Sequence, residues 1–420
     1  MSGPPPPSFT EAIEEGLTVP PDQHSVVSSS GSRSARRWDD PPEDEPGAGV
    51  PGENITTMVF VKGISIRNYV ESEITHLTFT PTGTHFAALA PKVSNARSCH
   101  RDGPSTLTAW SAANGARLPM PHVSSHGVRV TRGCAFRPGG ADMVVACPFL
   151  RAGAGGGGGG GGGSGDSSLD GMFGPEPRLE VYDLGRRTRL LKADVPVTAP
   201  LAWSPDGTAL AAVSARDPSR VMLVATTGRP AVPGRSAAAP AGRVTAVLMG
   251  HMDAVTQLAF LPPSSSVAGA AGGAALVSAG RDGYVRVTSV ASGRTLHKIE
   301  IGARAPASIL RVSPDGNLVA TVWGRDVVLW HLDSGRVHNY NLNAVRLAEG
   351  WPLCVSPDCR YLACRTEDGF DVSDLATGKF RGEFARVGPP ITAAAFDRDA
   401  RRLVVGDYAG GLQLFEVVTA

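Results

Sequence analysis

Residues 250–301, GHMDAVTQLAFLPPSSSVAGAAGGAALVSAGRDGYVRVTSVASGRTLHKIEI, contain the pattern that decides the fold class of the chain. Four short runs of apolar or alternating residues lie within it, at 255–260, 276–283, 284–289 and 295–301. Gly250, Pro262 and the pair Ser292-Gly293 lie before or between these runs, at positions typical of turns. Four short runs separated by turn residues predict a four-stranded antiparallel sheet.

One such sheet cannot bury both of its faces and needs neighbouring sheets, and the same pattern recurs elsewhere in the chain. An apolar residue followed two positions later by proline recurs at the end of the first run of each unit: Phe79/Pro81, Phe136/Pro138, Trp203/Pro205, Phe260/Pro262, Val312/Pro314 and Val355/Pro357, with Phe396 continuing the series without a proline. An apolar second strand follows each of them, at 86–89, 144–147, 210–213, 276–278, 318–320, 362–364 and 403–405. Seven units in the same order predict a repeat architecture of short strands.

The stretch 250–301 also resembles a WD40 repeat, because it opens with Gly-His and carries Asp282 in the turn before its third strand. The Trp-Asp pair that ends the third strand in this family is Thr288-Ser289 here. The position of that tryptophan corresponds, along the chain, to Trp110, Tyr182, Val224, Thr288, Trp330, Ser373 and Phe415. The resemblance covers about residues 57–420. It implies an all-β fold, a seven-bladed WD40-type β-propeller of four-stranded antiparallel blades.

The two ends of the repeat region predict how such an array closes. A strand pair at 58–66 precedes the first complete unit, whereas the last unit stops after a third strand at 412–417. We therefore expect the N-terminal strand to complete the last sheet and to close the ring, which leaves no open sheet edge.

The composition of the chain changes near residue 52 and divides it into two parts. Residues 1–52 are rich in Pro, Ser and Gly and are expected to form a disordered tail, and residues 53–420 are expected to form the propeller. A flexible insertion is expected at about 152–177, where residues 155–163 are all glycine. This run lacks the Lys-Ser/Thr and the strand–helix context of a phosphate-binding loop, and the sequence predicts no cofactor.

Charge and cysteine content limit the classes of partner. The formal net charge of the 420 residues is +1, so we expect no nucleic-acid partner. No apolar run approaches the roughly 20 residues that span a bilayer, and we expect no membrane partner. The six cysteines do not form the framework of a small disulfide-rich domain. They are expected to be reduced, which is typical of the cytoplasm or the nucleus.

His251, Ser278 and Asp282 are the residue types of a nucleophilic triad. The WD40 resemblance instead implies that they form the hydrogen-bonded set that ties the entry of a blade to the turn before its third strand. No Gly-x-Ser-x-Gly elbow accompanies Ser278. We therefore expect a structural role for the three residues and no catalytic residue among them.

Two further groups suggest a metal site, and a third suggests lipid binding. His122 and His126, with Cys99-His100, lie in loop sequence, and Cys354, Cys359 and Cys364 straddle a predicted strand–turn–strand; neither has the spacing of a zinc site. The segment Phe380-Arg381-Gly382 is a fragment of the motif that phosphoinositide-binding propellers carry, and phosphoinositide binding is kept as a minor alternative.

The leading functional hypothesis is a non-catalytic interaction platform that binds proteins or peptides as part of a multiprotein complex. Short turns on a rigid scaffold are common recognition sites. The candidate contact residues next to the turns before the third strands are Arg281, Trp323, Glu367 and Tyr408. We expect the Gly/Ala-rich loops to lie on the opposite side, where ordering them would cost entropy.

The alternative is a propeller enzyme with an active site at the mouth of the channel. Such a site needs polar residues from several blades that converge on the channel. The predicted starts of the first strands are mostly apolar: Ile74, Arg129, Ala199, Val255, Ala307, Pro352 and Ile391. They predict a channel without a set of polar side chains.

Overall fold

The structure is a computed structural model of the 420-residue chain, and it describes residues 58–67, 73–91, 105–118, 133–139, 144–150, 177–228, 240–270, 272–302, 305–342, 351–367, 369–375, 380–385 and 388–419. The predicted tail at 1–52 lies outside these residues, as does 152–176 of the predicted insertion. Cys99, His100, His122, His126 and Arg129 also lie outside them, so the expectations for these residues stay predictions.

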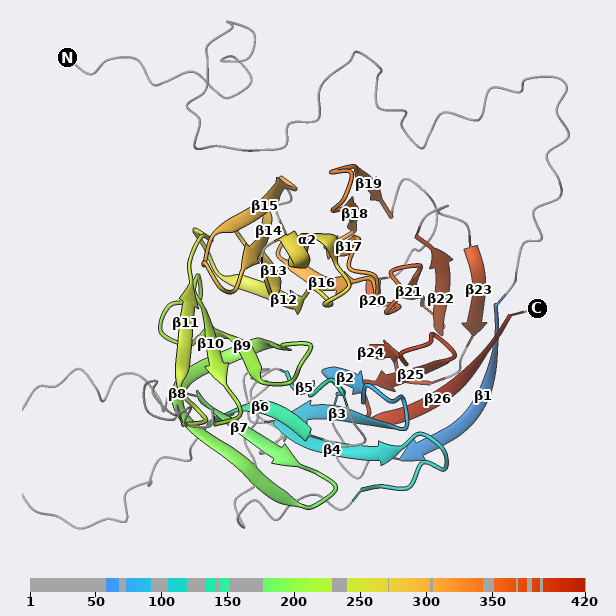
Figure 1. The fold of residues 1–420 in the computed structure, drawn as a ribbon. Helices are drawn as coiled ribbons and strands as arrows, with labels where there is room; N and C mark the ends of the chain where they lie inside the picture. The colour runs from blue at the N-terminus through green and yellow to red at the C-terminus, as the bar shows by residue number, and fades with distance from the viewer. Residues whose placement is uncertain are drawn as a thin grey trace, which may run out of the picture.

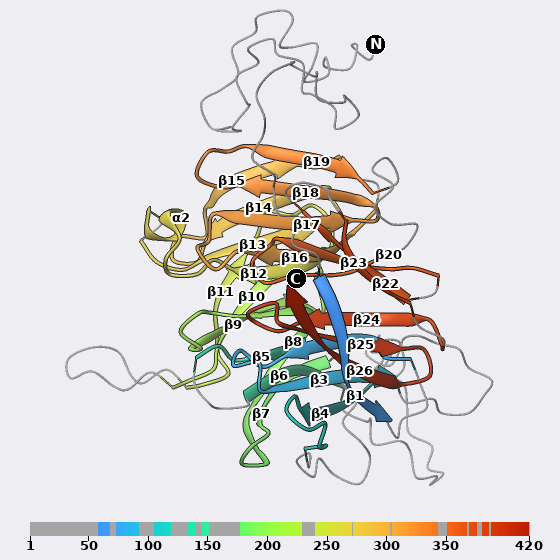
Figure 2. The ribbon, with the colours of Figure 1, turned by 90° about the vertical axis from the view of Figure 1, so that its right-hand side faces the viewer.

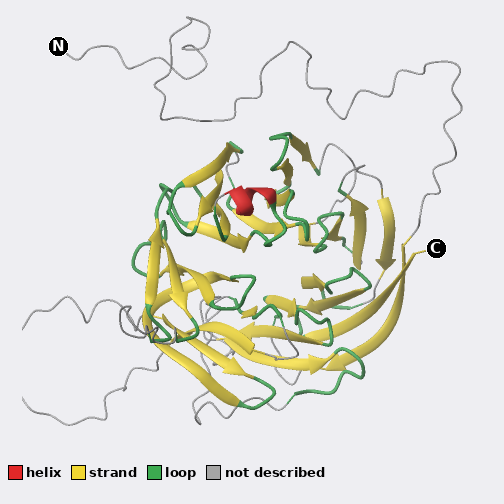
Figure 3. Cartoon of the chain, viewed as in Figure 1, coloured by secondary structure: helices red, strands yellow, loops and turns green. Residues whose placement is uncertain are grey.

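Strands form almost all of the described secondary structure (Figures 1 and 3). Three sheets are built from four consecutive antiparallel strands each. Their strands are β12 (Val255–Phe260), β13 (Ala275–Gly280), β14 (Tyr284–Ser289) and β15 (Thr295–Glu300); β16 (Ala307–Val312), β17 (Leu318–Trp323), β18 (Asp326–His331) and β19 (Val337–Asn341); and β20 (Trp351–Val355), β21 (Tyr361–Arg365), β22 (Gly369–Asp374) and β23 (Phe380–Ala385). A single turn of helix, α2 (Ser266–Ala270), lies between β12 and β13.

The N-terminal half contains a three-stranded and a seven-stranded sheet. The first comprises β2 (His76–Phe79), β3 (His85–Pro91) and β4 (Ser105–Ser111). The second comprises β5 (Ala135–Phe136), β6 (Val144–Leu150), β7 (Pro177–Asp183), β8 (Thr188–Trp203), β9 (Ala209–Ser214), β10 (Val221–Ala225) and β11 (Val244–Leu248). The 16-residue β8 pairs with β7 through residues 188–196 and with β9 through residues 197–203, so it serves as the outer strand of one four-stranded set and the inner strand of the next.

The last sheet combines the two ends of the described chain. It contains β24 (Ile391–Phe396), β25 (Arg402–Asp407) and β26 (Gly411–Thr419), and its fourth strand is β1 (Met58–Arg67). The β1 strand pairs antiparallel with β26 from Met58↔Thr419 to Arg67↔Gly411, with one bulge between Lys62 and Ile64. The two strands lie side by side in Figures 1 and 2.

The sheets follow one another around a common centre (Figure 1). Their innermost strands contact each other in the order β2, β5, β8, β12, β16, β20 and β24, and β24 contacts β2 again. In the described residues, hydrophobic clusters fill the junctions between successive sheets, including the junction of the last sheet with β2 and β3. Burial between neighbouring sheets is therefore the main source of cohesion.

The sequence column that corresponds to the family tryptophan is buried in every unit. Each member pairs with the second strand of its own sheet: Trp110 with Phe86, Tyr182 with Val145, Val224 with Leu210, Thr288 with Leu276, Trp330 with Val319, Ser373 with Leu362 and Phe415 with Leu403. The prediction of the second and third strands is confirmed, because the column keeps its register although only two members are tryptophan.

Candidate functional site

His251 connects two segments of the fourth sheet through side-chain hydrogen bonds. Its Nδ1 lies 2.9 Å from Oδ1 of Asp282, and its Nε2 lies 2.8 Å from Oγ of Ser278. Asp282 also accepts the backbone N–H of Met252 at 3.0 Å. The three side chains therefore tie the connection that enters β12 to the turn between β13 and β14.

Burial and hydrogen bonding together determine the protonation of this network. It lowers the pKa of His251 and outweighs the opposing effect of the Asp282 carboxylate. For Asp282, burial acts to raise the pKa, but hydrogen bonds from the Met252 amide and from His251 outweigh it, so its pKa is lowered. At neutral pH a neutral His251 donates its Nδ1–H to an ionised Asp282, and its Nε2 accepts the Ser278 hydroxyl.

Gly280 closes the network from the side. A Cβ atom at this position would lie 2.4 Å from Nδ1 of His251 and 2.7 Å from Oδ1 of Asp282. Ser278 and His251 are themselves buried. A nucleophile needs access to its substrate, whereas this hydroxyl is enclosed and donates to the imidazole ring, so the geometry favours a packing role for the three residues.

The turns between second and third strands lie at one end of the sheets, together with the connections that enter β12, β20 and β24; we call this end the upper rim. Arg281 and Tyr408 occupy equivalent places on it. The backbone N–H of Arg281 donates to the carbonyl of Ala254 at 2.8 Å, and that of Tyr408 donates to the carbonyl of Pro390 at 3.0 Å. The side chain of Tyr408 is 62% exposed, and that of Arg281 is also exposed.

Trp323 does not project from the upper rim, so this expectation was wrong. It is the last residue of β17, pairs with Ala307, and is 1% exposed. Its Nε1–H donates to Oγ1 of Thr321 at 2.9 Å. The register places Trp323 at the position of Gly280, one residue before the position of Arg281, and in this turn Gly324 takes the outer place.

Glu367 is exposed in the turn between β21 and β22. The register of that sheet nevertheless places Arg365, and not Glu367, at the position equivalent to Arg281. Nη1 of Arg365 donates to the carbonyl of Ile391 at 3.4 Å. Glu367 therefore belongs to the rim but to a different place in its turn.

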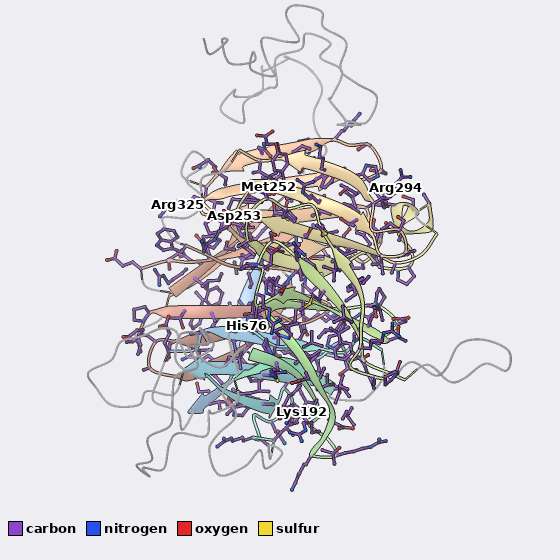
Figure 4. All side chains as sticks on the ribbon, turned by 90° about the vertical axis from the view of Figure 1, so that its left-hand side faces the viewer. His76, Lys192, Met252, Asp253, Arg294 and Arg325 are labelled. Carbon is purple, nitrogen blue, oxygen red and sulfur yellow. The ribbon has the colours of Figure 1, made fainter. Side chains whose placement is uncertain are left out.

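Trp351 and Met252 are rim residues that sequence reasoning missed. Trp351 is 54% exposed at the start of β20, with the Arg325 guanidinium 5.3 Å from its ring centroid. Met252 is 87% exposed, and its neighbour Asp253 is exposed as well (both labelled in Figure 4). Met252 lies in the connection before β12, and Trp351 is the first residue of β20; the repeat pattern does not extend to either position, and a search for aromatic and methionine residues at the entry to each first strand would have found them.

The predicted separation of short turns and Gly/Ala-rich loops holds only in part. The connections β3–β4 and β6–β7 join second to third strands, so their strand ends lie on the upper rim together with Arg281. The connections β10–β11 and β12–β13 are at the opposite end. The strands of a sheet alternate in direction, so connections that join the same pair of strands in different units, such as second to third, lie at the same end of the sheets.

Two cavities lie between the innermost strands and meet at Arg311 of β16. The first, which we call the upper cavity, has a volume of about 880 Å³ and opens beside Arg281. The second has a volume of about 600 Å³ and lies toward the ends of β2 and β24. Arg281, Arg311, His76 and Gln257 line the upper cavity, so the expectation of a channel without polar side chains was wrong.

The cysteine and arginine groups singled out in the sequence have other partners. Cys354 packs in one hydrophobic cluster, and Cys359 and Cys364 pack in the neighbouring one. Arg381 donates to Oδ2 of Asp374 at 2.8 Å and is mostly buried. Within the described ranges, no group of three or more His, Cys, Asp or Glu side chains is placed to hold a metal ion.

Residues 242–289 match the family model "WD domain, G-beta repeat", WD40, which confirms the resemblance over the fourth unit. A comparison with curated proteins finds no matching sequence. In the part of the chain that the structure describes, no helix has the length and apolar character required to cross a bilayer. WD40 repeats generally mediate interactions between proteins.

Proposed function

We propose that this protein is a non-catalytic interaction platform, a closed seven-bladed WD40-type propeller that binds partner proteins or peptides at its upper rim. The closed cycle of contacts between innermost strands and the pairing of β1 with β26 support the seven-bladed arrangement. We further propose that it acts within a multiprotein complex in the cytoplasm or the nucleus.

The observation that carries the binding proposal is the set of side chains exposed on the upper rim. Trp351 and Tyr408 are more than half exposed, and Arg281, Arg325 and Met252 lie on the same rim. Trp, Tyr, Arg and Met are enriched at protein interfaces, and aromatic and arginine side chains most often anchor them. These residues lie at the ends of strands or in the short connections next to them, so little conformational entropy is lost when a partner binds.

The enzyme alternative has weaker support. The hydroxyl of Ser278 is enclosed, and the described lining of the two central cavities contains no Asp or Glu to act as a general base. Arg381, the basic residue of the phosphoinositide-like fragment, is paired with Asp374. Neither observation favours catalysis or lipid binding over partner binding.

Site-specific photo-crosslinking in cells tests the proposal. Benzoylphenylalanine placed at Tyr408 or at Trp351 is expected to capture a discrete partner band. The same probe at Leu190 or Val337, apolar residues exposed on strands away from the rim, is the matched control. Capture from the control positions alone would contradict the proposal.

A further inference from the structure

We propose that the upper cavity binds acidic side chains of a partner peptide, with Arg311 at its base and Arg281 at its mouth. This inference rests on the proposed partner-binding function and names the chemistry of the segment that is bound. Charged side chains elsewhere on the upper rim would then contact the peptide residues on either side of the bound acidic side chains.

The charge of the cavity is the first argument. Arg281 and Arg311 are its charged lining residues at neutral pH, and the described lining contains no carboxylate. Arg311 makes one hydrogen bond, from Nη1 to the carbonyl of Leu310 at 3.3 Å, and in the described part of the chain no acidic side chain pairs with either arginine. The two arginines that line the cavity thus have no carboxylate partner among the described residues.

The position of the Arg311 guanidinium is the second argument. Arg311 of β16 lines the cavity together with His76 of β2 and Gln257 of β12, which belong to two other sheets. Burial, together with Arg311, lowers the pKa of His76 to about 4, so His76 is neutral at pH 7. His76 lies on the innermost strand β2 and is labelled in Figure 4. Arg311 is exposed and lines both central cavities, so its guanidinium is accessible to a ligand in them.

The remaining lining suits a short acidic side chain. Thr78, Thr256 and Gln257 supply hydroxyl and amide groups, and Leu77, Phe79 and Leu258 supply apolar walls. A low-dielectric wall strengthens the attraction between a carboxylate and a guanidinium. Carboxylates also match the planar fork of arginine.

A peptide fits these features better than a nucleic acid does. Single-stranded nucleic acid needs an extended basic groove that follows several phosphates, with aromatic side chains for the bases. Here the described arginines that line the two central cavities are only Arg281, Arg311 and Arg398, and the formal net charge of the whole chain is only +1. The cavity opens beside Arg281, on the same rim that carries Trp351 and Tyr408.

Fluorescence anisotropy with a labelled octa-glutamate peptide and the full-length protein tests this inference. We expect saturable binding that weakens as salt rises, because the contact is between charges. Arg311→Gln is expected to raise Kd by about tenfold or more, and Arg281→Gln by a smaller factor, since Arg311 lines both central cavities and Arg281 only the upper one. Arg294→Gln is the matched control with the same loss of charge; Arg294 lies on the opposite end of the sheets (Figure 4), and its variant is expected to bind like the wild type.

Four results would overturn the inference. The first is that Arg294→Gln and Arg311→Gln weaken octa-glutamate binding equally, and the second is that Arg311→Gln does not weaken it. The third is that an oligo-dT of equal charge binds more tightly than octa-glutamate and that its binding depends on Arg311. The fourth is that octa-glutamate binds only after residues 1–52 are removed. In the last case the chain's own acidic segment at 39–45, and not a partner, would occupy the cavity. If octa-glutamate does not bind but crosslinking at Tyr408 still captures a partner, this inference alone is rejected and the proposed function stands.

Discussion

The fourth and the last sheets hold the same turn of the upper rim in different ways. In the fourth sheet, which is one continuous stretch from β12 to β15, the side chains of His251, Ser278 and Asp282 lock the turn. In the last sheet, Asp407 instead accepts the backbone N–H groups of Ala409 at 3.0 Å and Gly411 at 2.7 Å, and the fourth strand comes from the other end of the chain. The turn between the second and third strands can thus be held by a side-chain network or by a carboxylate that accepts backbone N–H groups. The last sheet also depends on a strand that is distant in the sequence.

The largest effect is expected from removing that distant strand. Deletion of residues 1–66 would expose the unpaired edge of β26 and remove Ile64 and Ile66 from the cluster that contains Leu412 and Leu414. We expect soluble expression to be lost, because an open apolar edge promotes aggregation. Deletion of residues 1–52 is the control and is expected to leave the melting temperature nearly unchanged. If the longer deletion folds with the melting temperature of the wild type, the comparison between the two sheets fails.

The next effect concerns the network of the fourth sheet. His251→Ala leaves Asp282 and Ser278 without their shared partner, and we expect a loss of about 1–3 kcal/mol in the free energy of unfolding. Gly280→Ala, which forces a Cβ against the imidazole, is expected to act in the same direction. His338→Ala on the exposed β19 is the control and is expected to change stability by less than about 0.5 kcal/mol. Urea unfolding of the purified variants measures all three, and equal losses for His251→Ala and His338→Ala would remove the proposed role of the network.

The pH dependence of stability sharpens the same comparison. The pKa of His251 is lowered from 6.5 in the fold, so the unfolded chain binds more protons than the folded chain as the pH falls below about 6.5. The stability that neutral His251 contributes is therefore complete above that pH and is lost as the solution becomes more acidic. The lowered pKa of Asp282 adds a loss at still lower pH. We expect the wild type to lose more stability between pH 7.5 and 5.5 than His251→Ala, and parallel pH profiles would show that His251 is not the titrating group.

The smallest effect is expected at a backbone position of the last sheet. Ala400, in the turn between β24 and β25, has φ of 54°, where the corresponding turns of two other sheets carry Gly207 and Gly316. A side chain in this region costs about 1–2 kcal/mol, partly offset by the entropy that glycine loses on folding. Ala400→Gly is expected to stabilise the protein by up to about 1 kcal/mol. A destabilised variant in thermal unfolding would show that the turn is not strained.

The strands were predictable because each repeats a local signal, whereas the surface was not. The buried positions occupied by Phe79 and Trp110 in the first unit recur at the same place in every later unit. A shift of the strand register by one residue would place these side chains on the wrong face of the sheet. Trp323 was placed outside by such a shift of one residue, which only the pairing of β16 with β17 corrects. Trp351 is the first residue of β20, and the repeat pattern does not extend to this position. Arg311 lies inside a first strand, and its place in the cavity depends on strands that are distant in the sequence.

Quantitative affinity capture from cell extract with an Arg281→Ala, Tyr408→Ala double variant tests the central claim most directly. Both side chains are exposed and both turns are held by backbone hydrogen bonds, so we expect the variant to unfold at the wild-type temperature. Recovery of the specific partners, measured by mass spectrometry against the wild type, is expected to fall by about tenfold, the loss that corresponds to about 1.4 kcal/mol of binding free energy. An unchanged set of partners at unchanged recovery would contradict the assignment of the binding surface to the upper rim.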